Sequence, residues 1–273
     1  MNTELKRLSK NRLGKLEQRF LSYTQLKRLT TVRYGELRFI LDVTALQEKK
    51  ILSRLALAGV IVRLKRGVYM FPPRLPVGGI WNPGEYLILR ELMKTCDDGR
   101  YQLCGWPVFN RYGFTEQVPT RVYAYNNRLS GNRTIGGQEF TFIKVTSKRL
   151  GGTEAIQTPD GVKMIMPTKA RTLMDAVYDW SRFSTLPAAY TWIRQAVKAD
   201  QRLADELVQS ACRYGNQGTI RRIGYVLESL SLQGAWKKRM QRTLRRSTSL
   251  IPLVPGRAAR GIANRDWVVI VNE

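Results

Sequence analysis

The sequence predicts an α+β protein. We expect an N-terminal winged helix-turn-helix domain, followed by a larger mixed α/β domain with a helical C-terminal part. Three observations support this. Residues 32–71 have the pattern of a helix, a capped helix and a β-hairpin, a stretch rich in proline and glycine follows at 72–79, and strand patterns precede helical ones beyond Leu186. We therefore place the winged domain at 1–74, a linker at 75–80 and the second domain at 81–273.

Residues 1–31 indicate one or two helices, because apolar side chains recur at roughly helical spacing from Leu5 to Phe20. Lysines and arginines lie between them, and these either contact phosphates or form a solvated face. A short amphipathic helix is expected next, at about Tyr34 to Leu41.

The clearest helix begins at Thr44, which forms a capping box with Gln47. Gly59 favours the left-handed conformation that ends a helix. A rotation of about 100° per residue gives this helix an inner face and an outer face. The inner face carries Ala45, Ile51, Leu52, Leu55 and Gly59. The outer face carries Leu46, Gln47, Lys50, Ser53, Arg54 and Leu57.

Residues 60–71 read as strand, basic turn and strand, with Arg63, Lys65 and Arg66 near the tip. Such a wing can grip the DNA backbone beside a groove. The alternative is an ordinary helix and hairpin with a solvated basic face. The order of cap, helix and wing favours DNA binding.

The charge balance points to a polyanionic partner: 46 Lys and Arg stand against 21 Asp and Glu, a net charge of +25. Residues 1–74 hold 17 basic and 5 acidic residues, and the remaining 199 hold 29 and 16. The higher charge density makes the first part the principal DNA-binding unit. No apolar run approaches the roughly 20 residues that span a bilayer, and no signal-peptide pattern opens the chain. We expect a cytoplasmic protein without a membrane partner.

Catalysis is disfavoured, because the chain contains no histidine. Histidine-based triads, a histidine general base and histidine-containing zinc sites are thereby excluded. Cys96, Cys104 and Cys212 lack metal-binding spacing and are expected to be reduced and partly buried. The acidic residues form no recognisable catalytic motif. We predict no catalytic residues, no metal site and no cofactor.

The second domain should begin with a helix from about Asn82 to Cys96. Arg171 and Asp175 lie one turn apart on a helix that starts at Pro167, which is the spacing of an ion pair. Strands are expected at 121–125, 140–145 and 162–166, helices at 189–198, 203–213 and 219–230, and a strand at 267–271 that joins the central sheet.

Residues 229–265 contain nine basic residues and no acid. They form either a phosphate-binding surface or a solvated helix, and the one-sided charge favours the first. Lys237, Lys238, Arg242 and Arg245 are the candidate contacts.

The segment KILSRLALAGVIVRLKRGVYMFP (50–72) resembles the winged helix-turn-helix of AbiEi-type antitoxins. GFTEQVP (113–119), PTKARTLMD (167–175) and RRIGYVLESL (221–230) resemble later segments of that family. The resemblance implies a repressor of its own operon at inverted repeats. It also implies an antitoxin of a type IV toxin–antitoxin module, whose C-terminal domain counters a nucleotidyltransferase-like toxin in abortive infection, a phage defence. The long N-terminal segment and the basic tract depart from the family pattern, so DNA contacts outside the winged domain stay open.

We therefore expect a sequence-specific DNA-binding autorepressor and antitoxin that binds double-stranded DNA of its own promoter. Gln47 suits adenine, Lys50 and Arg54 suit guanine or phosphate, and Leu46 suits a thymine methyl group. The DNA-contact set is completed by Thr44, Ser53 and the wing cations. The alternatives are a metal-dependent nucleic-acid-processing enzyme and a general nucleic-acid-binding protein that stacks bases on Trp106, Tyr112 and Tyr123.

Overall fold

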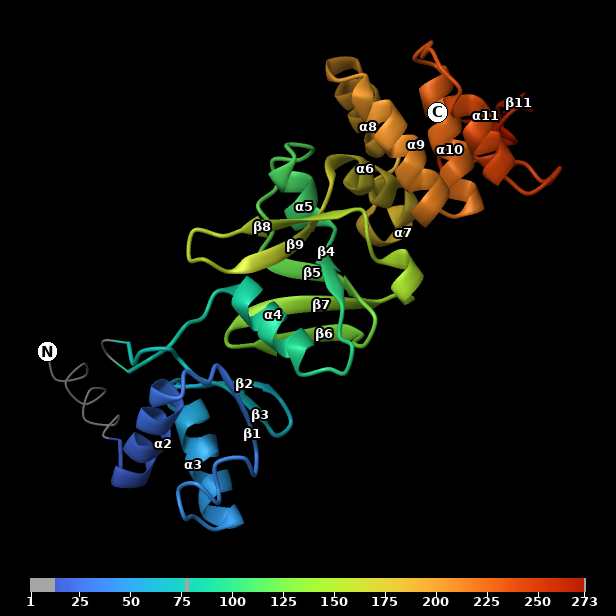
Figure 1. Cartoon of the computed structure of the whole chain (residues 1–273). Coiled ribbons are helices and arrows are strands. Elements are labelled where there is room, and N and C mark those ends of the chain that lie inside the picture. The colour runs from blue at the N-terminus through green and yellow to red at the C-terminus, as the bar shows by residue number, and fades with distance from the viewer. Residues whose placement is uncertain (1–12, 77–78, 273) are drawn as a thin grey trace, which may run out of the picture. The chain divides into compact units, whose positions relative to one another are not determined.

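The computed structural model describes residues 13–76 and 79–272 (Figure 1). The chain divides into two compact units. The first comprises Met1–Gly99, Gly131–Thr141 and Pro159–Val162, and the second comprises Arg100–Ser130, Phe142–Thr158 and Lys163–Glu273. This division follows spatial proximity, and the domain boundaries at 74 and 81 stay a prediction. Within the described ranges, no helix is both long and apolar enough to cross a membrane.

The first unit contains a winged helix arrangement. Its elements are α2 (Lys15–Leu26), β1 (Thr31–Arg33), α3 (Ala45–Leu57), β2 (Val62–Lys65), β3 (Val68–Met70) and α4 (Glu85–Lys94). The strands form an antiparallel sheet of order β1-β3-β2, and the hairpin β2–β3 is the wing. Helices α2 and α3 lie side by side in Figure 1. The predicted helical positions before Leu13, including Leu5, lie outside the described residues.

Apolar side chains from α2, α3 and the sheet form one core under this arrangement. Phe20, Leu52 and Phe71 are each at most 1% exposed. Burying a side chain of this size contributes about 1.5–3 kcal/mol. The core therefore fixes the rotation of α3 about its own axis and decides which of its faces is exposed to solvent.

The predicted helix at 34–41 is wrong, because this segment forms turns in place of a helix. Gly35 has a φ of 101°, and its N–H donates to the Glu48 carboxylate at 2.9 and 3.1 Å instead of joining a helix. The apolar pattern still marks burial correctly, since Leu37 and Leu41 are 1% and 6% exposed. One helix-like hydrogen bond, from Leu41 N to Leu37 O, remains at 3.1 Å.

A β-rich region follows α4. Its elements are β4 (Tyr101–Leu103), α5 (Trp106–Arg111), β5 (Arg121–Asn126), β6 (Gly131–Ile135), β7 (Gln138–Lys144), the 3-10 helix η1 (Ser147–Arg149), β8 (Thr153–Gln157) and β9 (Lys163–Pro167). Four strands form a sheet of order β4-β5-β7-β6, and β8 pairs with β9. The three strands predicted in this region are confirmed, with boundaries that differ by a few residues.

The C-terminal part is helical, as predicted. It contains α6 (Lys169–Tyr178), α7 (Trp180–Phe183), α8 (Ala188–Ala199), α9 (Arg202–Tyr214), α10 (Gln217–Glu228) and α11 (Trp236–Thr243), followed by β10 (Ile251–Pro252), β11 (Ile262–Asn264) and β12 (Val269–Val271). The prediction that the last strand joins the central sheet is wrong. β12 forms a separate sheet of order β10-β12-β11. Trp267, just before β12, is fully buried and its ring packs closely against Gly224 of α10. A Cβ at Gly224 would lie only 2.2 Å from this ring. This contact holds β12 against α10.

The predicted ion pair between Arg171 and Asp175 is confirmed and belongs to a larger buried group. Arg171 Nε lies 3.0 Å from Asp175 Oδ2, and Arg149 Nη2 bonds to Asp175 Oδ1. Arg171 Nη2 also donates to the carbonyl oxygen of Arg149 at 2.8 Å. All three side chains are less than 10% exposed. One carboxylate therefore compensates two guanidinium groups in the interior of the second unit.

Segment 113–119, whose purpose the sequence did not reveal, is the loop between α5 and β5. Phe114 stacks on Trp192 of α8, with ring centroids 5.5 Å apart and planes at 11°. Asn110 of α5 donates to the Thr115 carbonyl oxygen at 3.1 Å. The first contact fastens the loop to the helical part, and the second ties it to α5, just before β5 begins.

Candidate nucleic-acid interface

Helix α3 begins with the predicted capping box. The Thr44 hydroxyl accepts from Gln47 N at 3.3 Å, and Gln47 Oε1 accepts from Thr44 N at 2.8 Å. Gly59, with a φ of 71°, follows the last turn. The two reciprocal bonds satisfy backbone donors that would otherwise lack partners at a helix start. The predicted limits of this helix are confirmed.

The two predicted faces of α3 are also confirmed. Ile51, Leu52 and Leu55 are each at most 1% exposed. The outer positions Leu46, Gln47, Lys50, Ser53, Arg54 and Leu57 are all exposed. An α-helix with one solvated polar face can enter a major groove, which is about 12 Å wide. Sequence reasoning missed Glu48, a fully buried residue on the inner side of α3 whose carboxylate accepts from Gly35 N.

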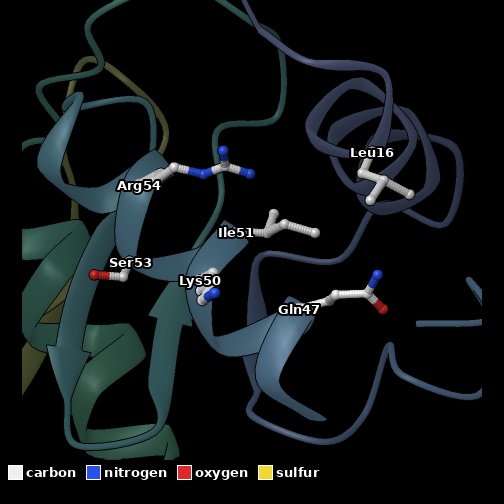
Figure 2. A pocket seen from close by; sticks show the side chains of 6 residues that line it. All are labelled: Leu16, Gln47, Lys50, Ile51, Ser53 and Arg54. Atoms are coloured by element: carbon white, nitrogen blue, oxygen red, sulfur yellow. The ribbon is translucent and has the colours of Figure 1, made fainter. Parts of the chain in front are cut away.

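A hollow of about 290 Å³ lies between α2 and α3 (Figure 2). It is lined by Leu16, Gln47, Lys50, Ile51, Ser53 and Arg54. In Figure 2 the side chains of Gln47 and Arg54 extend toward the helix that carries Leu16, whereas Ser53 points the other way. The structure therefore brings Gln47, Lys50 and Arg54 together around one depression, as the sequence predicted for a single face.

Arg54 is held by an acid that the sequence did not single out. Arg54 Nε lies 3.0 Å from Glu17 Oε1, and Glu17 Oε2 accepts from Gly14 N at 2.7 Å. The Glu17 side chain is 10% exposed, whereas that of Arg54 is 64% exposed. The capping bond from Gly14 marks Glu17 as a first-turn acid, but its reach to α3 has no signal in the sequence.

The three predicted wing cations are used differently. Arg63 and Arg66 are exposed, and no acid pairs with either in the part of the chain that the structure describes. Lys65 Nζ instead donates to the Thr95 carbonyl oxygen at 2.8 Å, at the end of α4. The pairing of β2 with β3 shifts register between Arg63, which is exposed, and Lys65, which bonds to the end of α4.

The C-terminal candidates also separate into two kinds. Lys237 of α11 bonds to Glu228 Oε1 and, at 2.7 Å, to Asp266 Oδ2. The hydrogen bonds that Lys237 donates to Asp266 and Glu228 raise the pKa of Lys237. By contrast, the cationic groups of Lys238, Arg242 and Arg245 are exposed and meet no acid in the described ranges. Thus two acids just outside the acid-free tract neutralise one of its predicted DNA contacts.

A second hollow, of about 540 Å³, lies within the second unit. It is lined by Gly152, Thr153, Thr168, Glu206, Gln209, Ser210, Arg213 and Tyr214. A carboxylate and a guanidinium group occur together in this lining. Such mixed charge does not favour a polyanion, so we assign no DNA contact to this hollow.

The aromatic residues considered for base stacking are half-buried in the second unit. Trp106 packs edge-on against Phe109 at 5.7 Å, and Tyr123 packs against Phe183 at 5.4 Å. The Tyr112 hydroxyl donates to the Pro167 carbonyl oxygen at 2.8 Å. These rings already have intramolecular partners. Among the described residues, no group of three or more Cys, Asp and Glu side chains lies together in a way that could hold a metal ion.

Comparison with known proteins identifies a similar fold. The crystal structure of the RV2827C protein from Mycobacterium tuberculosis is similar to this chain with a TM-score of 0.60, over 95% of this chain and 92% of that one. The two proteins share a fold. It is the mixed α+β fold with an N-terminal helix, a small antiparallel sheet, a β-rich region and a helical C-terminal part, so the predicted fold class is confirmed. At 13% sequence identity the likeness concerns the fold alone. No protein-family model and no curated protein sequence matches the chain.

Proposed function

We propose that this protein is a sequence-specific DNA-binding repressor that acts on its own promoter. The solvated outer face of α3 supports this most directly, together with the wing cations Arg63 and Arg66, which pair with no acid among the described residues. In the proposed complex α3 enters the major groove, where Lys50 and Arg54 contact guanine or phosphate. Arg63 and Arg66 hold the backbone and set the register of the helix.

The charge of the chain supports the same proposal. A net charge of +25 attracts DNA at long range, and each neutralised phosphate releases counterions. This contribution is independent of sequence. Selectivity therefore has to come from the side chains of α3, and the exposed cations Lys238, Arg242 and Arg245 would add affinity without choosing a sequence.

We further propose an antitoxin role in a type IV toxin–antitoxin module. Its support is the resemblance of segments 50–72 and 113–119 to AbiEi-type proteins. The role is tested by expressing the chain in cells that carry the nucleotidyltransferase-like toxin encoded beside its gene. Growth should be restored by the natural chain and equally by Lys50→Ala/Arg54→Ala, because antitoxin activity is assigned to the C-terminal part. Unrestored growth would refute this role.

DNA recognition is tested by fluorescence anisotropy with a duplex of the protein's own promoter and a shuffled duplex of equal composition, at several salt concentrations. We expect a preference for the promoter of at least about 1,000-fold. Lys50→Ala/Arg54→Ala should remove most of this preference and keep the circular dichroism spectrum, because both side chains are exposed. Equal affinity of the natural chain for both duplexes would exclude sequence-specific recognition.

The same preparation tests the two alternatives. We propose that the protein has no nuclease activity, so incubation with Mg²⁺ or Mn²⁺ should leave DNA and RNA intact. Competitor RNA should displace the promoter duplex only at high concentrations, where it competes as a nonspecific polyanion. Cleavage, or binding of RNA in preference to the promoter, would favour the alternatives.

A further inference from the structure

The ion pair between Glu17 and Arg54 joins α2 to the outer face of α3. Glu17 is almost buried and is fixed at both carboxylate oxygens. One accepts from Gly14 N at 2.7 Å, and the other lies 3.0 Å from Arg54 Nε. A carboxylate held in this way cannot follow a moving partner. The ion pair therefore restrains the more exposed Arg54 side chain, which is 64% exposed.

The atom that Glu17 contacts decides what Arg54 can still do. Arginine has five N–H donors in a planar fork, one on Nε and two on each Nη. The contact with Glu17 uses Nε. Neither Nη group has a partner among the described residues, and the side chain is 64% exposed. These are the donors that form a bidentate contact with the O6 and N7 atoms of guanine.

An acid close to a DNA-binding face is unfavourable on electrostatic grounds alone, because it repels phosphates. At this position the acid is almost buried, one of its oxygens accepts from Gly14 N and the other is paired with Arg54, so its charge is partly compensated within the protein. Fixing the guanidinium plane in advance also lowers the entropy lost when DNA binds, since an arginine side chain carries about 2 kcal/mol of rotamer entropy.

We propose that Glu17 is a positioning residue for base recognition, which orients Arg54 so that its Nη fork meets a guanine in the major groove. This inference rests on the proposed function, since it requires that α3 reads DNA. Glu17 itself touches no base. It acts through Arg54 and belongs to the specificity of the site, although it lies on a different helix.

The test is a double-mutant cycle of Glu17→Gln, Arg54→Ala and the double variant, measured by anisotropy on the promoter and on every single-base-pair substitution of it. Arg54→Ala should lose roughly 5- to 100-fold discrimination at one guanine position, the value of a bidentate pair. Glu17→Gln should lose about half of that discrimination on a logarithmic scale, and the double variant should match Arg54→Ala. Replacing that guanine by 7-deazaguanine should weaken DNA binding by the natural protein and leave DNA binding by Arg54→Ala unchanged.

Glu36→Gln is the matched control. Glu36 also accepts a backbone hydrogen bond from the residue three positions earlier, Arg33 N at 2.8 Å, and it carries the same charge in the same unit. It has no ion pair with Arg54. Both substitutions should slightly tighten binding to all sequences by removing one negative charge. Only Glu17→Gln should reduce the discrimination between guanine and the other bases at that position.

Glu17→Asp separates orientation from charge and from folding. It keeps the negative charge but shortens the reach to Arg54 by one methylene, so discrimination should fall without tighter general binding. Thermal unfolding of each variant shows whether α2 has stayed folded. If folded Glu17→Gln and Glu17→Asp both retain the full preference for guanine, Glu17 does not position Arg54. A natural chain that shows no promoter preference would instead remove the proposed function itself.

Discussion

Lys65 donates a hydrogen bond from its ammonium group to the carbonyl oxygen of Thr95, at 2.8 Å. Thr95 is the C-cap of α4, where backbone carbonyl groups lack helical partners and the helix dipole is negative. A cation at this end of a helix is stabilising. Strand β2 of the wing is therefore fastened to α4 by one of the three side chains that the sequence assigned to the DNA backbone.

This relationship predicts opposite outcomes for two neighbouring cations. Lys65→Met should lower the free energy of unfolding by about 1–2 kcal/mol, because it removes a charged hydrogen bond to a helix end. Arg66→Ala should change stability by less than about 0.5 kcal/mol. It should reduce the slope of log affinity against log salt by about 0.9 for a lost phosphate contact. Urea unfolding and salt-dependent anisotropy check the pair, and equal stability losses would contradict the assignment.

The C-terminal cations divide in the same way. Lys238→Ala/Arg242→Ala should weaken binding to promoter and shuffled DNA alike and lower the salt slope by about 0.9 per phosphate contact. Lys237→Ala should cost stability, about 1 kcal/mol, because Glu228 and Asp266 lose a shared partner. An unchanged salt slope in the double variant would remove the C-terminal tract from the proposed interface.

Asp175 should be indispensable for the stability of the second unit. Asp175→Asn leaves Arg149 and Arg171 without a countercharge in a site where both are less than 10% exposed. Breaking a buried ion pair in this way costs about 3–5 kcal/mol. Glu206→Gln, an exposed acid on α9, is the control and should cost less than about 0.5 kcal/mol. A loss below about 1 kcal/mol for Asp175→Asn would mean that the buried group relaxes readily.

Glu91 should make the first unit sensitive to acid. Burial raises the pKa of this carboxyl, but hydrogen bonds and charges from Lys94 and Arg90, each 2.9 Å away, outweigh burial and lower the pKa below its ordinary value of 4.5. The unfolded chain therefore takes up a proton at higher pH than the folded one. The stability that Glu91 contributes is complete above about pH 4.5 and is lost as the pH falls through the lower, folded-state pKa.

The measurement compares unfolding free energies of the natural chain and Glu91→Gln between about pH 3 and pH 6.5. The difference between them should shrink as the solution becomes more acidic. Lys94→Met should reduce this difference at the upper end of the range, since it removes one of the two cations. A difference that is constant with pH would show that Glu91 titrates equally in both states.

Local patterns predicted a large part of the fold. The capping box at Thr44, the alternation of faces along α3 and the ion-pair spacing of Arg171 and Asp175 each depend on residues within one or two turns, so they could be read from the chain. The turns at 34–41 could not, because the Gly35 N–H is satisfied by Glu48 across a tertiary contact. Apolar spacing reported the burial of this segment and not its backbone conformation.

The candidate site shows the same limit. Exposure of Lys50 and Arg54 follows from helix geometry, so the sequence predicted it correctly. The partners of Lys65, Lys237 and Arg54 come from other elements, and a count of charge along the chain cannot find them. Lys65 is held at the end of α4, and Lys237 is held by the two acids that flank the basic tract. Arg54 is oriented by Glu17.

The capping box at the start of α3 has a consequence for the choice of base. A two-bond contact with adenine needs the carbonyl oxygen of the Gln47 amide to accept from N6 while its NH₂ group donates to N7. That oxygen already accepts from Thr44 N. Opening the cap costs about 1 kcal/mol, which offsets much of what the contact would contribute. With the cap closed, the amide oxygen keeps one lone pair for adenine N6, but the side chain is tied to the start of α3. Gln47 should therefore distinguish adenine from guanine less well than an unrestrained glutamine.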